Sequence, residues 1–273
     1  MIRPDDLPDF ERPPIIEAVM SVQFTTPVEY REIYARDVWA LFEKQFPRVE
    51  EQLPLPASFE VFGAPGSTGL PLKIEPMTGP LRNRYWFLVA DGRELIQFQH
   101  DRFVHNWRKM LDAQNEYPRF EPILEKFESE LGTLDGFFQK KGWGPIAPNQ
   151  CELTYVNRMP LINENGEQFP LSLYFRKMDM SLTGDATDFA LRLQQVITDS
   201  NGNPIGRLYI DTSTQADTAG RRQVALTLTA RGQPEKPTIP AVVAFLQTQR
   251  ERIVRTFTEF TSDAAHEMWG RTQ

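Results

Sequence analysis

The side chains best suited to metal binding or nucleophilic catalysis are scarce in this sequence. There are three histidines, His100, His105 and His266, and one cysteine, Cys151. Metal sites draw on closely spaced His, Cys and carboxylate ligands, whereas a predicted turn separates His100 from His105. Residue order leaves a Ser-His-Asp or Cys-His arrangement open, but no nucleophile-elbow pattern supports it, and Cys151 begins a predicted core strand. We predict no metal site, no cofactor and no catalytic residue, and we lean against an enzyme.

The segment Gly-Ala-Pro-Gly-Ser-Thr-Gly at residues 63–69 has the composition of a phosphate-binding loop. It lacks the Gly-Lys-Ser/Thr ending of a P-loop, and no clear apolar strand leads through it into a helix. Clusters of glycine and proline mainly mark turns. The sequence therefore favours a plain loop over a phosphate site.

Glu17 stands out because it is a carboxylate in an otherwise largely apolar predicted strand, residues 15–24. A buried carboxylate is costly unless it is paired, and Arg102 and Arg158 are its best candidate partners. We predict that Glu17 and Arg158 pair and join the two halves of the chain. The role of Glu17 has two explanations. It is structural, in an ion pair or at an exposed edge position, or it belongs to a polar site that faces a ligand.

A mixture of aromatic, cationic and amide side chains makes a candidate binding site. Its members are Glu17, Arg102, Trp107, Tyr117, Asn157 and Arg158. Such mixtures suit protein interfaces and the stacking of nucleobases or peptides. Packing in the core is the competing explanation for the aromatic members, since aromatic residues make up 11% of the chain.

The central element that positions these residues is a predicted three-stranded meander, residues 84–108. Asp91-Gly92 between two apolar runs predicts a tight hairpin, because glycine accepts a positive φ. The third strand alternates, so its side chains point to opposite faces. One face receives Phe103, His105 and Trp107, and the other receives Arg102, Val104, Asn106 and Arg108.

The rest of the chain shows a similar alternation of strands and helices. We predict strands at 15–24, 59–62, 72–75 and 151–159 and three more after residue 188, with helices at 30–46, from about 118 to 141, and 239–269. Residues 172–188 are ambiguous. Each half, 15–148 and 149–273, begins with a strand, continues into a meander and ends with a long helix, after an extended arm at 1–14. The sequence thus predicts an α+β fold with antiparallel sheets, three principal long helices and two pattern-similar halves packed as one unit. This layout resembles curved-sheet folds of the TATA-binding-protein type.

Composition restricts the classes of protein and of partner. The 273 residues carry a formal net charge of −7, so the molecule as a whole lacks the positive charge that is typical of nucleic-acid-binding proteins. No apolar run approaches the roughly 18 residues of a membrane span, and the N-terminus lacks the layout of a signal peptide. A single cysteine rules out an internal disulfide and fits a reducing compartment. We expect a cytoplasmic protein without a membrane partner.

Several ordered motifs carry a family resemblance. They are Pro14, Glu17 and Ala18 within residues 13–24, the strand from Phe98 to Trp107, and Tyr155, Asn157 and Arg158. In this order, over nearly the whole chain, they resemble a sporadically distributed prokaryotic family with no assigned activity. The resemblance implies no reaction. It does imply the patchy distribution that is typical of cargo on mobile elements, such as defence or toxin–antitoxin loci.

Three functional hypotheses follow. The preferred one is a non-enzymatic binding protein, an accessory or neutralising partner of another protein that is encoded nearby, with a homodimer left open. The alternative is a small-ligand sensor or enzyme with a site near Glu17 and Arg158, which a deep cavity lined by those residues would favour. The third is nucleic-acid binding through a concave sheet, which the acidic net charge disfavours without excluding it.

Overall fold

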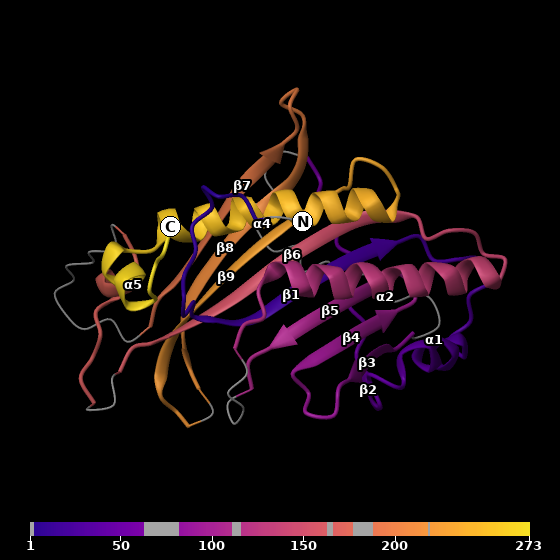
Figure 1. Ribbon diagram of the computed structural model, residues 1–273, viewed down its shortest axis with the longest axis horizontal. Helices are drawn as coiled ribbons and strands as arrows, with labels where there is room; N and C mark the ends of the chain where they lie inside the picture. The colour runs from indigo at the N-terminus through magenta and orange to yellow at the C-terminus, as the bar shows by residue number, and fades with distance from the viewer. Residues whose placement is uncertain (1–2, 63–81, 111–115, 163–165, 177–187, 218) are drawn as a thin grey trace.

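Within the residues that the structure describes, nine strands form one open, antiparallel sheet in the spatial order β2-β3-β4-β5-β1-β6-β9-β8-β7 (Figure 1). The structure is a computed structural model that describes residues 3–62, 82–110, 116–162, 166–176, 188–217 and 219–273. The strands are β1 (Ile15–Phe24), β2 (Arg48–Gln52), β3 (Arg84–Leu88), β4 (Glu94–Gln99), β5 (Arg102–Arg108), β6 (Pro148–Pro160), β7 (Ala190–Thr198), β8 (Pro204–Ala216) and β9 (Arg222–Gly232). The predicted α+β class with antiparallel strands is confirmed.

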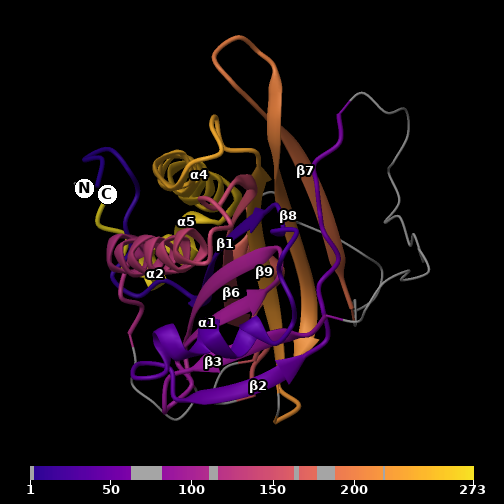
Figure 2. The same ribbon diagram turned by 90° about the vertical axis from the view of Figure 1, so that its right-hand side faces the viewer.

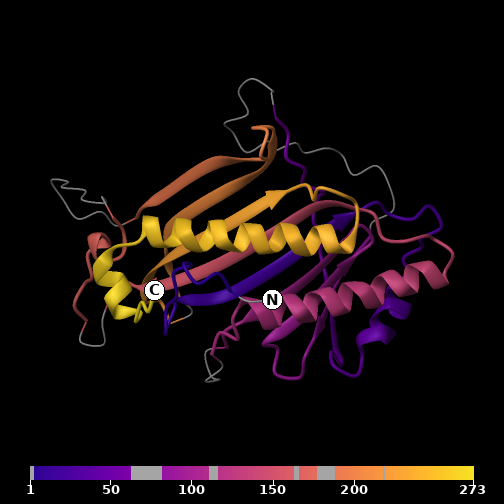
Figure 3. The ribbon, with the colours of Figure 1, turned by 45° about the horizontal axis from the view of Figure 1, so that its top comes forward.

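Helices cover one face of this sheet. They are α1 (Tyr34–Phe42), α2 (Phe120–Lys140), α3 (Leu171–Tyr174), α4 (Ile239–Phe260) and α5 (Asp263–Met268). The two long helices, α2 and α4, lie side by side across the face (Figures 1 and 3). Helix α1 packs on the same face, where the rings of Phe42 and Phe103 lie 5.9 Å apart. In the part of the chain that the structure describes, no helix lies on the opposite face (Figure 2), and none is long and apolar enough to cross a bilayer.

The two halves of the chain follow the same path around the centre of the sheet. Strands β1 and β6 pair antiparallel at that centre. In the first half the last strand, β5, returns to lie beside β1, and in the second half β9 returns to lie beside β6. Each half then ends in a long helix, α2 or α4. The sheet is therefore continuous across the two halves, as in the predicted curved-sheet layout.

Apolar alternation decides which face of the sheet the helices cover. In β1, Ala18, Met20 and Val22 are fully buried, and the register sets them opposite Trp107, His105 and Phe103 of β5. Glu17, Ser21 and Gln23 point to the other face, together with the apolar Val19. Burial of one row in each strand therefore fixes both the register and the polar character of the uncovered face.

Several predicted boundaries are wrong. Helix α1 is shorter than 30–46, since Ile33 is exposed and adds nothing to the buried stripe. The single helix expected at 239–269 is two, because Thr261 Oγ1 bonds back to Phe257 O and Ser262 caps α5 through the N–H of Ala265. Residues 59–62 form no strand, and β2 was not predicted. The predicted strand 72–75 and the glycine-rich loop 63–69 lie outside the described residues.

Candidate functional site

The sheet face opposite α2 and α4, called here the polar face, has a charge opposite to that of the whole chain. Strand register places eight arginines on it: Arg48, Arg84, Arg102, Arg108, Arg158, Arg192, Arg207 and Arg231. The same alternation places four carboxylates there: Glu17, Glu50, Glu152 and Asp211. The strand residues of this face thus have four more positive than negative charges, in a chain of net charge −7.

An extended segment, residues 53–62, lies on the polar face and is called here the strap (Figure 2). Two glutamines of the sheet hold its backbone. Gln99 accepts from Leu55 N at 2.8 Å and donates to Leu55 O at 2.9 Å. Gln23 accepts from Ser58 N at 3.0 Å and donates to Ser58 O at 2.7 Å. A carboxamide that pairs with both backbone groups of one residue recognises an extended chain whatever its side chain is.

The spacing of these anchor points indicates the backbone conformation that the polar face accepts. Leu55 and Ser58 are three residues apart, and three residues further along the strap Arg207 Nη2 donates to Val61 O at 2.8 Å. Three residues per turn is the period of a polyproline II helix, which has no internal hydrogen bonds and leaves its backbone groups available to a partner. Pro54 and Pro56 favour that conformation.

An acidic side chain anchors the far end of the strap. The side chain of Glu60 is only 3% exposed and forms an ion pair with Arg207. Tyr209 Oη donates to Glu60 Oε1 at 2.7 Å, and Arg231 Nη1 lies 3.7 Å from the same oxygen. Burial and this hydrogen bond raise the pKa of Tyr209 to about 12. The polar face therefore provides a subsite for one carboxylate next to the backbone anchors.

Of the predicted site residues, Glu17, Arg102 and Arg158 lie on the polar face. Glu17 does not pair with Arg158, and that prediction is wrong: its carboxylate accepts from Asn106 Nδ2 at 2.7 Å. Glu17 lies opposite Val156, and Arg158 is two residues further along β6, where its guanidinium is exposed to water and gains little from an ion pair. Arg102 donates to Gln23 and to Pro56 O, so it supports the strap.

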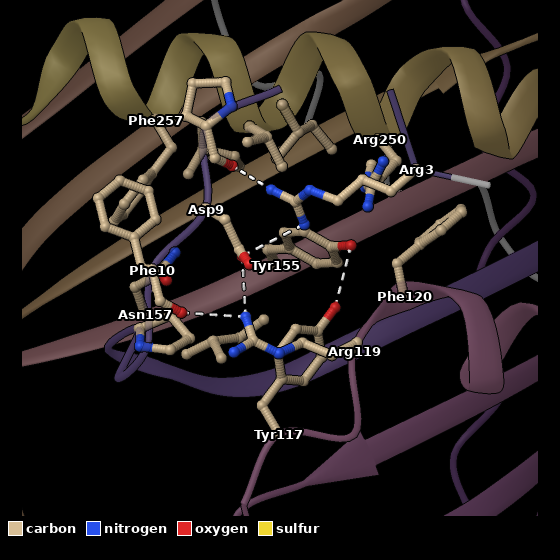
Figure 4. A pocket seen from close by; sticks show the side chains of 16 residues that line it. Arg3, Asp9, Phe10, Tyr117, Arg119, Phe120, Tyr155, Asn157, Arg250 and Phe257 are labelled. Carbon is tan, nitrogen blue, oxygen red and sulfur yellow. Dashed lines mark hydrogen bonds and ion pairs between the residues drawn. The ribbon is translucent and has the colours of Figure 1, made fainter. Parts of the chain in front are cut away.

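The other three, Trp107, Tyr117 and Asn157, lie on the helix-covered side, at a cavity of about 70 Å³ (Figure 4). Tyr117 and Asn157 line this cavity, and the ring of Trp107 packs on Tyr117 with centroids 5.3 Å apart. The central strands form its floor, α2 and α4 its sides, and the N-terminal arm its outer wall. The six residues therefore form two separate groups on opposite faces of the sheet.

The arm is held over the cavity by Arg119, which the sequence did not single out. Arg119 is the N-cap of α2 and has φ 76°, a conformation that costs a non-glycine residue about 1–3 kcal/mol. Its Nη1 donates to Asp9 Oδ1 and to Phe10 O, both at 3.0 Å. The residue with the strained backbone is therefore the one whose guanidinium holds the arm over the cavity.

Two tyrosines meet at the cavity. Their hydroxyl oxygens, Tyr117 Oη and Tyr155 Oη, lie 3.2 Å apart. Burial raises the pKa of Tyr155 to about 12 and that of Tyr117 well above its usual value. Both hydroxyls therefore stay protonated over the physiological range. Tyr117 donates its hydroxyl proton to Tyr155 Oη, so the hydroxyl proton of Tyr155 can be donated to another group.

Two residues with reactive side-chain types, His105 and Cys151, are buried within the core. His105 Nδ1 lies 2.8 Å from Glu130 Oε2 and connects β5 to α2, with both side chains at most 8% exposed. Cys151 is fully buried, and burial raises the pKa of its thiol. Among the described residues, no three His, Cys, Asp or Glu side chains are placed to hold a metal.

Comparisons of the chain with protein-family models, with curated proteins and with solved structures found no match.

Proposed function

We propose that this chain is a non-enzymatic binding protein that holds an extended, proline-containing, acidic segment of a partner protein on its polar face. The observation that carries this proposal is the pair of carboxamide clamps, Gln99 and Gln23, which hold both backbone groups of two strap residues three positions apart. The strap shows the chemistry that the face accepts, and the partner segment replaces it.

The strap is suited to being displaced. Three of its apolar side chains contribute little to anchoring it, because Leu53, Phe59 and Val61 are 83%, 50% and 64% exposed. Backbone hydrogen bonds, one carboxylate and the ring of Phe62, which lies 4.6 Å from the Arg207 guanidinium, hold it. As part of the same chain it competes at an effective concentration on the order of millimolar. A partner segment that makes the same anchoring contacts and additional ones displaces the strap.

The arginine excess on the polar face favours nucleic acid as a second candidate partner. Seven of the eight arginines, however, already donate to groups of the chain, and only the exposed Arg158 has no such contact described. Phosphate contacts would have to replace these hydrogen bonds. The carboxamide clamps, in contrast, match the N–H and C=O groups of a peptide backbone, so a protein segment that displaces the strap makes the same kind of contacts and is the better fit. A partner encoded nearby, as the family resemblance implies, is the expected source.

The test uses the strap as the probe. Residues 53–62 are replaced in the full-length chain by a Gly-Ser linker of equal length, and a labelled peptide with the strap sequence is titrated while fluorescence anisotropy is recorded. We expect saturable binding to the linker variant and much weaker binding to the unmodified chain, whose own strap competes. Gln23→Ala in the linker variant should weaken binding at least about fivefold. Gln215→Ala, an exposed glutamine on the same face, is the matched control.

Two results would overturn the proposal. One is failure of the strap peptide to bind a linker variant that retains its thermal unfolding transition. The other is tighter binding of single-stranded or duplex oligonucleotides than of the peptide, which would transfer the function of this face to nucleic acid.

A further inference from the structure

The cavity under the N-terminal arm has a surplus of positive charge. Arg3 and Arg119 both pair with Asp9, at 3.2 and 3.0 Å. Arg250, whose side chain is 5% exposed, pairs with Glu121 at 2.7 Å. Three guanidinium groups thus share two carboxylates, which leaves one positive charge unbalanced in a partly buried place. Desolvated charge is unfavourable without a partner, so this site favours one additional anion.

Hydrogen-bond donors without acceptors meet at the same place. Arg3 Nε is buried and has no hydrogen-bond partner. The hydroxyl pair of Tyr117 and Tyr155 has one proton left after the bond between the two oxygens. Figure 4 shows the tyrosine hydroxyls on the side of the cavity where the Arg3 and Arg250 side chains lie. An acceptor bound there would satisfy both unused donors.

The remaining wall is apolar and the space is small. Phe10, Phe120, Phe257, Leu228 and Ile253 contribute hydrocarbon surface to the lining. A volume of about 70 Å³ holds roughly five to seven water-sized atoms, at about 10–15 Å³ each. The occupant therefore has few non-hydrogen atoms, of which one end is anionic and the other apolar.

We propose that this cavity binds a small monocarboxylate with a short aliphatic tail, of the size of propionate or butyrate. The carboxylate accepts from the tyrosine hydroxyl pair and from Arg3 Nε, and its single charge balances the surplus guanidinium. The tail packs against the phenylalanine rings. Inorganic phosphate fits less well, because its charge exceeds the surplus and it offers no apolar atoms to the hydrocarbon wall.

The N-terminal arm controls entry to this site. Residues 3–13 form the outer wall and are fixed at several points besides Arg119. Phe10 forms a β-bridge with Arg271, and Asp6 pairs with Arg255 of α4. The arm has to lift for a ligand to enter, so bound carboxylate stabilises the closed arm. This site is on the other side of the sheet from the polar face and does not depend on the function proposed for that face.

The test is isothermal titration of the full-length chain with sodium butyrate, with butyramide as the neutral compound of the same shape. We expect butyrate to bind and butyramide to bind at least about tenfold more weakly, since hydrogen bonds to a charged acceptor contribute about 1.5–3 kcal/mol. Tyr155→Phe should weaken butyrate about tenfold. Tyr174→Phe, which removes a buried hydroxyl bonded to Pro160 O away from the cavity, is the matched control.

A second variant tests the space itself. Val254→Phe places a ring in the cavity and should abolish butyrate binding, while a cooperative thermal unfolding transition shows that the variant is folded. The proposal is overturned if butyrate fails to bind the unmodified chain, if butyramide or phosphate binds as tightly as butyrate, or if Tyr155→Phe binds butyrate as well as Tyr174→Phe does.

Discussion

Removing the Glu60 carboxylate by Glu60→Ala should detach the far end of the strap. Glu60 accepts hydrogen bonds from Arg207 and Tyr209, and its side chain is 3% exposed. Hydrogen bonds to a charged group are each worth about 1.5–3 kcal/mol. The Arg207 side chain is 22% exposed and regains water when the carboxylate is lost, and the released strap recovers conformational entropy. After these two offsets, we expect Glu60→Ala to lower the free energy of unfolding by about 2 kcal/mol.

Two measurements check this prediction. Urea denaturation gives the loss in free energy of unfolding, with Glu259→Gln, an exposed carboxylate of α4, as the control. A double-mutant cycle with Tyr209→Phe should show coupling of about 1 kcal/mol, because both changes remove the same hydrogen bond. Hydrogen exchange locates the effect: the amide of Ser58, close to Glu60, should exchange faster, and that of Leu55 should change less. Unchanged stability together with unchanged Ser58 exchange would refute the role assigned to Glu60.

Other substitutions probe the core, the arm and the face separately. Phe257→Ala should cost about 3–5 kcal/mol in urea denaturation, because Phe257 is 7% exposed and contacts the ring of Phe10 at 5.5 Å; an unchanged midpoint would mean that the buried stripe of α4 is misplaced. At Arg119, thermal unfolding should show the glycine variant to be about 1 kcal/mol more stable than the alanine variant, since only glycine adopts φ 76° without strain; equal stabilities would argue against that backbone conformation. The raised pKa of Tyr155 means that the unfolded chain loses this proton near pH 10 and the folded chain only near pH 12, so stability should fall as the pH rises through this window. Tyr155→Phe should reduce that slope by up to about 1.4 kcal/mol per pH unit, and an identical slope would contradict the burial of the hydroxyl. Glu17→Gln and Arg158→Met should have additive effects on the denaturation midpoint, whereas coupling above about 0.5 kcal/mol would restore the rejected pair.

The fold could be predicted from the sequence where burial of one face of a strand or helix gives apolar residues a regular spacing. Alternation in β5 predicted that Phe103, His105 and Trp107 share one face, and this is the helix-covered face. Asp91-Gly92 predicted a hairpin that the positive φ of Gly92 confirms. Strand β2, Arg48–Gln52, gives no such signal, because polar residues occupy both of its faces at the edge of the sheet. The helix is broken at Thr261 by side chains that form hydrogen bonds with nearby backbone groups. The spacing of apolar residues does not reveal such bonds.

The candidate site was only partly predictable because motif order does not specify the face of a sheet. Asn157 and Arg158 are adjacent in the sequence, yet one lines the cavity and the other is exposed on the polar face. The strap has the composition of an ordinary proline-rich loop, and its function becomes visible only through distant partners such as Gln99. Arg119 has a positive φ although it is not a glycine, so its residue type gave no indication of this conformation.

The most direct test of the peptide-binding function removes one backbone donor from the probe and nothing else. The strap peptide is synthesised with an N-methyl group on Ser58, and as a control on Ala57, whose N–H makes no described hydrogen bond. Both peptides are titrated against the linker variant by fluorescence anisotropy. N-methylation at Ser58 should raise Kd about tenfold or more, because Gln23 Oε1 loses its donor, while methylation at Ala57 should leave Kd nearly unchanged. Equal affinities of the two methylated peptides would contradict recognition of the backbone by the carboxamide clamps.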